Sequence, residues 1–270
     1  MKSIITGSSS VNDTSCSLRY SSLEDRSEIE QSEFLDRQRK MYFKDLNAYP
    51  EKTIFLGFDL DILPVLLDLT RPKSGSILFF TGINSKFKKF ITNICSSSDW
   101  KNNRDHIVFG IISPDADDYI EMLGFPGCQF ILNPYERTAA EIIFELSGIA
   151  EQRKYGRERG PAMILIIDDL WSYFCYNSDY GTFINLRWLI SYGPNSQIWP
   201  IVSIQLKDRQ KFKEPLLNLF GTIISEIRNQ PDNLLPAWQS QYLDAVRTYK
   251  TVIPDHILNM KDSTFPLIIP

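Results

Sequence analysis

Uninterrupted apolar runs alternate with segments of helical periodicity along most of this chain, and this alternation limits the possible folds more than any other feature. The runs at 76–82, 106–112 and 162–167 have the length and composition of strands that are buried on both faces. The intervening segments 83–97 and 138–154 repeat apolar side chains at helical spacing. Strand, helix and strand in this order indicate parallel pairing with a right-handed crossover. We therefore expect an α/β fold with a mostly parallel sheet and helices on both faces.

The same pattern continues on either side of these segments. Residues 53–69 contain two short β-rich pieces around a turn, which predicts a hairpin at the edge of the sheet. Further along the chain, helices are predicted at 181–191 and 213–220, and strands at 200–206 and 221–227. The ligand crevice of such a sheet lies at the carboxyl ends of its strands.

The two ends of the chain differ from the middle. Residues 1–23 are rich in Ser, Thr and Asn and predict a disordered tail, while 24–46 predict one amphipathic helix. We therefore expect this tail and helix in 1–50 and a single α/β domain in 51–270. The stretch 231–270 is interrupted by prolines, and we expect a short helix and an edge strand or hairpin there.

Composition excludes several kinds of protein. The formal net charge is −4, so there is no global positive field to hold a nucleic acid, and any DNA contact would be local or shared across an assembly. The four cysteines lie far apart and there are only two histidines, which indicates neither a zinc site nor a disulfide framework. No apolar run approaches the ~18 residues of a membrane span. A cytoplasmic protein without a membrane span is expected.

The turn after the run 76–82 resembles a phosphate-binding loop in its position between a buried strand and a helix. It aligns to the pattern G-x-x-x-x-G-K-[ST] as Gly82-Ile83-Asn84-Ser85-Lys86-Phe87-Lys88-Lys89. Gly82 and Lys88 fit the pattern. Phe87 replaces the second glycine, and Lys89 replaces the hydroxyl residue that binds Mg²⁺.

Both replacements argue against nucleotide hydrolysis. A side chain at Phe87 is expected to obstruct the anion where the backbone must approach phosphate, and the ammonium group of Lys89 cannot ligate a cation. The helix N-terminus and the positive charge remain, so weak anion binding is still expected while turnover is not. The simpler interpretation of Lys86, Lys88 and Lys89 is a solvated start of a helix.

Two carboxylates follow the apolar run 162–167. In a P-loop enzyme the first of them, here Asp168, holds Mg²⁺ through water, and the second, here Asp169, orients the attacking water. The alternative is that both acids cap the segment that follows them. Gln205 stands at the end of another predicted strand, where it could sense a γ-phosphate or be an ordinary solvent-facing residue. Asp168, Asp169 and Gln205 are the candidate catalytic residues, with Asp168 as the candidate metal ligand.

Further motifs surround these residues in a fixed order. They are LGFD at 56–59 with PVLLDL at 64–69, Arg153 at the end of a helix before the acid-tipped strand, SIQ at 203–205 and FGTII at 220–224. With the loop and the acids, they resemble the motor domains of the FtsK/SpoIIIE family in the HerA–FtsK group of P-loop ATPases, including the type VII secretion ATPases of the EccC and EssC kind. The resemblance spans roughly 52–229 and implies a RecA/FtsK-like fold.

The departures from the family pattern are specific. The phosphate loop is degraded, the second acid is Asp169 where the family usually has Glu, and the segment 191–197 lacks the arginines that family members carry there. The pair Asp168-Asp169 resembles the type VII secretion members more than the DNA pumps, and some of the tandem ATPase-like domains in those proteins are degenerate. The resemblance therefore implies a pseudo-ATPase, with ATP and Mg²⁺ as cofactors only in vestigial form.

Three functions follow as hypotheses. The first is a non-hydrolysing structural or regulatory module of a translocase or secretion assembly, which binds a related ATPase or forms a homo-oligomer. The second is an active ATP-driven translocase of DNA or protein with a divergent loop, in which Lys88 contacts the phosphates and Asp168 and Asp169 handle metal and water. The third is a crevice that now binds another anion or a peptide.

Overall fold

The computed structural model describes residues 33–42, 44, 49–59, 61–82, 86–100, 103–226, 256–260 and 263–270. The chain divides into two compact units, Met1–Phe43 and Lys44–Pro270. In the first unit, residues 33–42 form a helix within the segment where the sequence predicts one. The tail expected at 1–23 lies outside the described residues. Everything that follows concerns the second unit.

The second unit is built on an eight-stranded sheet with the order β10-β9-β8-β3-β7-β6-β4-β5. Its strands are β3 (Ile77–Thr81), β4 (Ile107–Ile112), β5 (Cys128–Leu132), β6 (Ala162–Ile167), β7 (Ile198–Gln205), β8 (Thr222–Glu226), β9 (His256–Met260) and β10 (Ser263–Leu267). Neighbouring strands from β8 to β5 pair in parallel, and β9 and β10 add an antiparallel edge. The mostly parallel sheet predicted from the sequence is confirmed.

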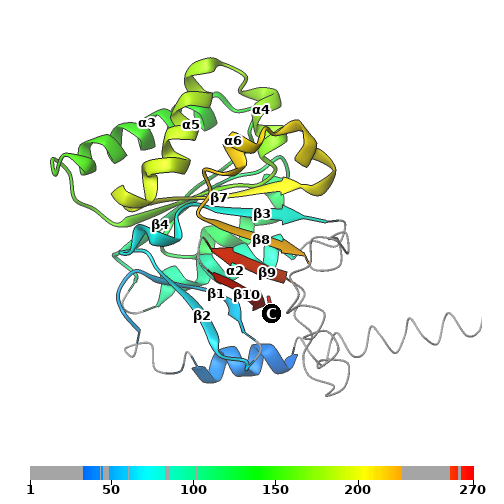
Figure 1. The fold of residues 1–270 in the computed structure, drawn as a ribbon. Coiled ribbons are helices and arrows are strands. Elements are labelled where there is room, and N and C mark those ends of the chain that lie inside the picture. The colour runs from blue at the N-terminus through cyan, green and yellow to red at the C-terminus, as the bar shows by residue number, and fades with distance from the viewer. Residues whose placement is uncertain are drawn as a thin grey trace, which may run out of the picture. The chain divides into compact units, whose positions relative to one another are not determined.

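Helices cover both faces of this sheet (Figure 1). They are α2 (Phe87–Ser96), α3 (Arg137–Lys154), α4 (Leu170–Tyr176), α5 (Tyr180–Tyr192) and α6 (Glu214–Leu217). In Figure 1, α3 to α6 lie above β7, and the side chains of α2 belong to the hydrophobic cluster on the other face of the sheet. Two hydrophobic clusters result, because the side chains of every buried strand alternate between the two faces.

The hairpin predicted near the start of the domain forms, but it is not an edge of the main sheet. Strands β1 (Thr53–Phe58) and β2 (Pro64–Asp68) make a separate antiparallel sheet. The backbone of Phe58 then exchanges two hydrogen bonds of 2.9 and 2.8 Å with Ile268, next to the chain end. A side chain at Gly57 would place its Cβ 2.5 Å from the Ile268 carbonyl oxygen, so this contact requires glycine. The prediction that this hairpin lies at the edge of the main sheet is wrong, because β1 and β2 pair only with each other and β1 reaches the C-terminal segment through a single bridge.

The last segments of the chain agree with the sequence where the structure describes them. Strands β9 and β10 form an antiparallel hairpin at one edge of the sheet, as predicted for the end of the chain. The short helix predicted in the same stretch lies outside the described residues. The 3-10 segment η4 (Ala116–Gly124) had no counterpart in the sequence-based assignment, whereas α4 is the segment that the two acids cap in the alternative interpretation of the sequence.

Helix α2 follows β3 and packs its apolar side against it. Phe87, Phe90, Ile91 and Ile94 are buried and recur at helical spacing, which gives the helix one continuous apolar stripe. The rings of Phe87 and Phe90 each lie 5.2 Å from the ring of Phe79 in β3. Each aromatic side chain buried in this way contributes about 1.5–3 kcal/mol to stability. Because Phe87 is the first residue of α2 and packs on β3, its packing determines where the preceding loop ends.

Candidate functional site

The carboxyl ends of β3, β7 and β6, three central strands, lie side by side at one end of the parallel strands. Thr81 of β3 is in register with Gln205 of β7, and Val202 of β7 is in register with Ile167, the last residue of β6. Parallel strands are about 5 Å apart, so the turn after β3 and the acid after β6 are separated by one strand, or about 10 Å. The topology therefore brings the turn that begins at Gly82, the two acids and Gln205 to the same end of these strands.

Asp168 follows β6 directly and is held by hydroxyl groups from three other elements. The hydroxyl of Tyr119, in η4, donates to Asp168 Oδ2 at 2.8 Å. The hydroxyl of Ser203, in β7, donates to Asp168 Oδ1 at 2.7 Å. Ser113, which follows β4, adds a longer contact of 3.4 Å to Oδ2. Both carboxyl oxygens of Asp168 thus already have partners inside the protein.

Asp168 is half-buried at the end of β6. Burial raises the pKa of this carboxyl above its ordinary value, while the hydrogen bonds from Ser203 and Tyr119 act in the opposite direction. Burial, followed by the charge of Asp168, also raises the pKa of the Tyr119 phenol, which therefore stays a neutral donor at physiological pH. Asp168 is the centre of a closed hydrogen-bond network between the strand tips and η4.

Asp169 has a different task. Its φ is 58°, in the left-handed region, and its side chain accepts hydrogen bonds from the backbone N–H groups of Trp171 and Ser172 at the start of α4. Its Oδ2 also accepts a 2.7 Å bond from the Ser172 hydroxyl and a 3.2 Å bond from Gln205 Nε2. The capping interpretation of the sequence is therefore confirmed for Asp169. The side chains of Gln205 and Asp169 lie close together, as the sequence predicted, but they form a hydrogen bond with each other.

The residues assigned to the phosphate loop are dispersed. Residues 83–85, which include the candidates Asn84 and Ser85, lie outside the described residues. Lys86 Nζ donates to the Ile269 carbonyl oxygen at 3.0 Å. The side chain of Lys88 lies 3.9 Å from Glu121 of η4, and Lys89 is exposed on α2. Both Lys86 and Lys88 are thus engaged by other segments of the protein.

The side chain of Phe87 does not stand in the loop. It is 3% exposed and belongs to the hydrophobic cluster between α2 and the sheet. The expectation that it obstructs an anion sterically is therefore corrected. Because α2 begins at Phe87, the side chain of this first helical residue points down onto β3.

Sequence reasoning missed the residues that surround Asp168. Tyr119 lies in a 3-10 segment, and no motif in the sequence points to it. Ser203 belongs to the SIQ motif at the end of a strand, but the pattern does not predict its bond to Asp168. Ser113 carried a usable signal, since it is a polar residue directly after the predicted strand at 106–112 and hence at the same end of the strands as Asp168.

The donors at this end of the strands do not fit Mg²⁺. This ion needs near-octahedral oxygen ligands at 2.0–2.1 Å and usually retains several waters. Here the first acid is enclosed by Tyr119 and Ser203, the second caps a helix, and an ammonium group stands at the position of the metal-binding hydroxyl. Among the described residues, no cluster of three or more His, Cys, Asp or Glu side chains could hold a metal ion.

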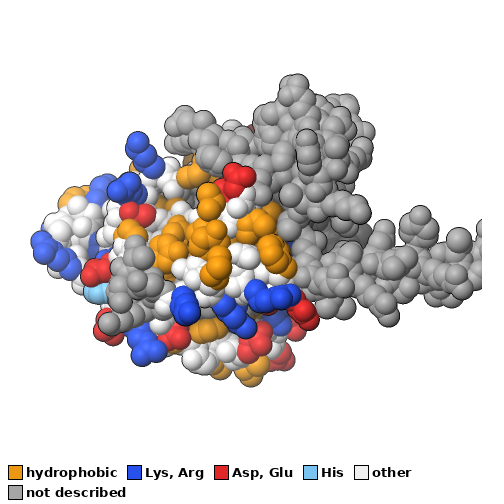
Figure 2. Space-filling view, turned by 90° about the horizontal axis from the view of Figure 1, so that it is seen from below, with side chains coloured by type: hydrophobic (Ala, Val, Ile, Leu, Met, Phe, Trp, Pro, Cys, Tyr) orange, Lys and Arg blue, Asp and Glu red, His pale blue; other side chains and the backbone are white. Residues whose placement is uncertain are grey.

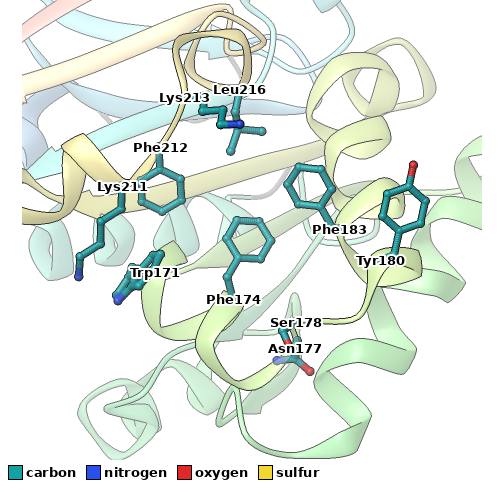
Figure 3. A pocket seen from close by; sticks show the side chains of 10 residues that line it. All are labelled: Trp171, Phe174, Asn177, Ser178, Tyr180, Phe183, Lys211, Phe212, Lys213 and Leu216. Atoms are coloured by element: carbon teal, nitrogen blue, oxygen red, sulfur yellow. The ribbon is translucent and has the colours of Figure 1, made fainter.

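An aromatic cavity of about 490 Å³ lies beyond the strand tips, between α4, the start of α5 and the segment before α6. The rings of Phe174, Phe183 and Phe212 face one another in Figure 3, with Phe174 and Phe183 5.6 Å apart. Lys211 lies over the ring of Trp171 at 4.2 Å. Trp171 and Phe174 thus line a cavity rather than filling the core completely.

The surface has no broad region of one charge on the face shown in Figure 2, where basic and acidic side chains are interspersed around hydrophobic ones. The net charge of −4 likewise predicts that the protein has no global positive field. Within the described ranges, none of the helices has both the length and the apolar character needed to span a bilayer.

Comparison with known proteins gives a likeness of structure only. No family model matches the sequence, and no curated protein is significantly similar to it. The structure is similar to ATPases 2 and 3 of EccC from Thermomonospora curvata, solved with a signal sequence peptide, at a TM-score of 0.58 and 13% identity over 83% of this chain and 41% of that one. It is also similar to ATPases 2 and 3 of EssC from Geobacillus thermodenitrificans, at a TM-score of 0.59 and 14% identity over 82% and 46%.

The likeness extends to a third kind of protein. The conjugation coupling protein TcpA of pCW3, solved with ATPγS, has a TM-score of 0.54 and 14% identity, over 81% of this chain and 66% of that one. This chain spans less than half the length of the EccC and EssC chains. Such low identities establish the fold alone. The chain has the α/β fold of FtsK/SpoIIIE-like P-loop ATPase domains, which confirms, at the level of fold, the resemblance predicted from its sequence.

Proposed function

We infer that this chain is a non-hydrolysing, ATPase-like module of a translocase or secretion assembly. The observation that supports this most strongly is the state of Asp168. In a P-loop enzyme the equivalent carboxylate must be available to the water shell of Mg²⁺. Here it is half-buried, and its two oxygens accept hydrogen bonds of 2.8 Å from Tyr119 and 2.7 Å from Ser203.

The other parts of the site support the same conclusion. Asp169 is committed to the start of α4 and to Gln205, so it is not placed to orient an attacking water. Lys88 points toward Glu121 on η4. A site that is to transfer a phosphoryl group needs the metal, the water and the cation positioned together, because positioning and charge stabilisation supply nearly all of the catalysis.

The setting of such a module follows from the proteins that it resembles in structure. The EccC and EssC structures contain ATPases 2 and 3 of those proteins, and this chain spans less than half of each. The partner we propose is therefore a related ATPase or a second copy of this chain, in the cytoplasm. In this setting the fold would serve as a rigid docking body, and nucleotide turnover would belong to the partner.

The experiment is a steady-state assay of phosphate release from Mg-ATP, with and without DNA. Wild type is compared with Lys88→Ala and Asp168→Ala, and with Lys154→Ala on α3 as a matched control for the loss of one surface lysine. We expect the same background rate from all four proteins, because contamination does not depend on these residues. Turnover that disappears in Lys88→Ala and Asp168→Ala but persists in Lys154→Ala would instead establish an active translocase ATPase.

A further inference from the structure

A second cavity, of about 340 Å³, opens at the opposite end of the parallel strands, where the strands begin. Gly160 lies two residues before β6, and Gln197 lies directly before β7. Asp168 follows the opposite end of β6, and six strand residues span about 20 Å. The cavity is therefore separate from the end that carries the acids. Its lining residues are Lys52, Arg153, Glu158, Arg159, Gly160, Asn195, Ser196 and Gln197.

Arg153, near the end of α3, is the innermost charge of this cavity. Its side chain is only 8% exposed. Its Nη1 donates to the carbonyl oxygens of Pro161 at 2.9 Å and Ser196 at 3.4 Å, which fixes the plane of the guanidinium. Its Nε is buried without a hydrogen-bond partner, and the nearest carboxylate, that of Glu158, is 4.0 Å away. The group is held in place, yet its donors are not saturated by the protein.

Gly160 leaves room beside this guanidinium. A Cβ at position 160 would lie 2.7 Å from Arg153 Nη2, so the guanidinium would have to move away from its present position. The backbone of Gly160 is not in the left-handed region, so its conformation alone does not require glycine. What the missing side chain provides is space next to Nη2, the end of the guanidinium that makes none of the hydrogen bonds to Pro161 and Ser196.

Two residues of the cavity wall have an unfavourable backbone conformation. Lys52 has a φ of 59° and Gln197 a φ of 58°, in the region that side chains rarely adopt. Lys52 Nζ donates to Gln197 Oε1 at 2.7 Å, which links the two strained residues across the cavity. Backbone strain of this kind persists where the surrounding structure enforces it, and it concentrates at ligand sites.

The charges of the lining residues favour a dianion. Three are cationic, Lys52, Arg153 and Arg159, and one, Glu158, is anionic, although the whole chain has a net charge of −4. A guanidinium with a fixed plane and open donors suits the tetrahedral oxygens of phosphate better than a single point charge does. The cavity volume lies near the lower limit for small-molecule sites, which leaves room for only a small organic group.

We propose that this cavity binds the phosphate group of a small phosphate monoester, or free phosphate, through Arg153 and Arg159. Arg153 Nη2 donates to the phosphate oxygens beside Gly160, while the exposed Arg159 closes over the anion from the rim. Lys52 adds positive charge from the side of β1. The site is independent of ATP hydrolysis at the opposite end of the strands, so its presence or absence does not decide the proposed function.

The test is calorimetric titration of the full chain with ribose 5-phosphate and with inorganic phosphate at constant ionic strength. Arg159→Ala removes an exposed charge and is expected to weaken binding about tenfold, the value of one charge-assisted hydrogen bond. Gly160→Ala keeps every charge and is expected to abolish binding by filling the space at Nη2. Arg187→Ala, an exposed arginine of α5, is the charge-matched control and should bind like wild type.

The outcomes separate clearly. Tighter binding of ribose 5-phosphate than of phosphate supports a monoester as ligand, and equal binding supports free phosphate. Absence of heat with both ligands, or equal weakening by Arg159→Ala and Arg187→Ala, overturns the proposal. Should Gly160→Ala lower the thermal midpoint, Arg159→Ala still decides the matter, because this side chain is exposed and its removal leaves the core intact.

Discussion

At the scale of single residues, Asp168 and Tyr119 connect parts of the chain that are distant in sequence. Their hydrogen bond of 2.8 Å joins the tip of β6 to η4, and Ser203 joins the same carboxyl to β7. A buried polar network of this kind stabilises a fold only while each member keeps its partners. The variants that remove one member at a time are therefore informative about stability.

Tyr119→Phe should destabilise the protein by about 1.5–3 kcal/mol, the range for a hydrogen bond to a charged group. The ring and its packing are kept, so the loss reports the hydroxyl alone. Urea unfolding followed by circular dichroism measures the change. Tyr155→Phe is the control, because Tyr155 is 60% exposed and should differ from wild type by at most about 0.5 kcal/mol. Equal stability of Tyr119→Phe and wild type would show that the network carries no energy.

Asp168 should make stability depend on pH in a defined direction. Burial raises its pKa in the folded protein above the ordinary value of 3.8, so the folded state binds this proton more tightly than the unfolded state does. The stabilisation from the protonated carboxyl is thus complete below the unfolded pKa and is lost as the pH rises through the folded pKa. The stability of wild type relative to Asp168→Asn should therefore fall as the pH rises above the ordinary value of 3.8. Urea midpoints measured from this pH upward test it, and a rising difference would contradict it.

At the scale of elements, the start of α4 depends on one residue with two requirements. Asp169 must accept hydrogen bonds from the first turn of the helix and must also adopt a φ of 58°. Asp169→Ala removes the cap, which costs about 1–2 kcal/mol, and adds backbone strain of about 1–2 kcal/mol. Asp169→Asn should cost clearly less, since Asn both caps helices and tolerates this conformation. Equal losses in urea unfolding would exclude the capping role.

Helix α2 shows why a phosphate-loop position can hold an aromatic residue. Phe87 packs on Phe79 and Phe90, so Phe87→Ala should destabilise the protein by about 3–5 kcal/mol through the cavity it leaves. The control is Phe144→Ala on α3, where the ring is 70% exposed and a change within about 0.5 kcal/mol is expected. Thermal or urea unfolding measures both. A loss below 1 kcal/mol, roughly the value of one buried CH₂, for Phe87→Ala would mean that the ring is not part of the core.

The sequence predicted the buried parallel strands well because they are apolar runs ended by a polar or glycine residue, as at Gly82 and Asp168. It missed η4, a nine-residue segment that forms a 3-10 helix rather than an α-helix or a strand. The gathering of Asp168, Asp169 and Gln205 followed from parallel pairing alone. Their hydrogen-bond partners did not, because Tyr119 reaches Asp168 only through tertiary packing.

The pairing of β1 with the C-terminal segment and the cavity around Arg153 were also beyond sequence reasoning. Phe58 and Ile268 are 210 residues apart, and no local pattern specifies such a contact. The cavity joins residues that precede β1, β6 and β7 with the end of α3. Local propensity and periodicity describe single elements, whereas sites of this kind arise from the order of the strands in the sheet.

At the scale of the whole molecule, the sheet has two chemically different sites, one at each end of its parallel strands. The end with Asp168 has the topology of a nucleotide site, yet its polar groups satisfy one another. The end with Arg153 has donors that the protein leaves open. The α/β fold is that of FtsK/SpoIIIE-like P-loop ATPase domains. We propose that the acids at the end of β6 stabilise this fold and do not bind a metal.

Calorimetric titration of the full chain with ATP, in Mg²⁺ and in EDTA, tests this claim most directly. Since Asp168 is held by Tyr119 and Ser203, ATP affinity should be the same with and without the metal, and Asp168→Asn should leave it unchanged. Any weak binding at the basic loop would then reflect charge alone and would fall with added salt. ATP binding that strengthens in Mg²⁺ and loses this gain in Asp168→Asn would show that the carboxylate still serves a metal site, and would contradict the account.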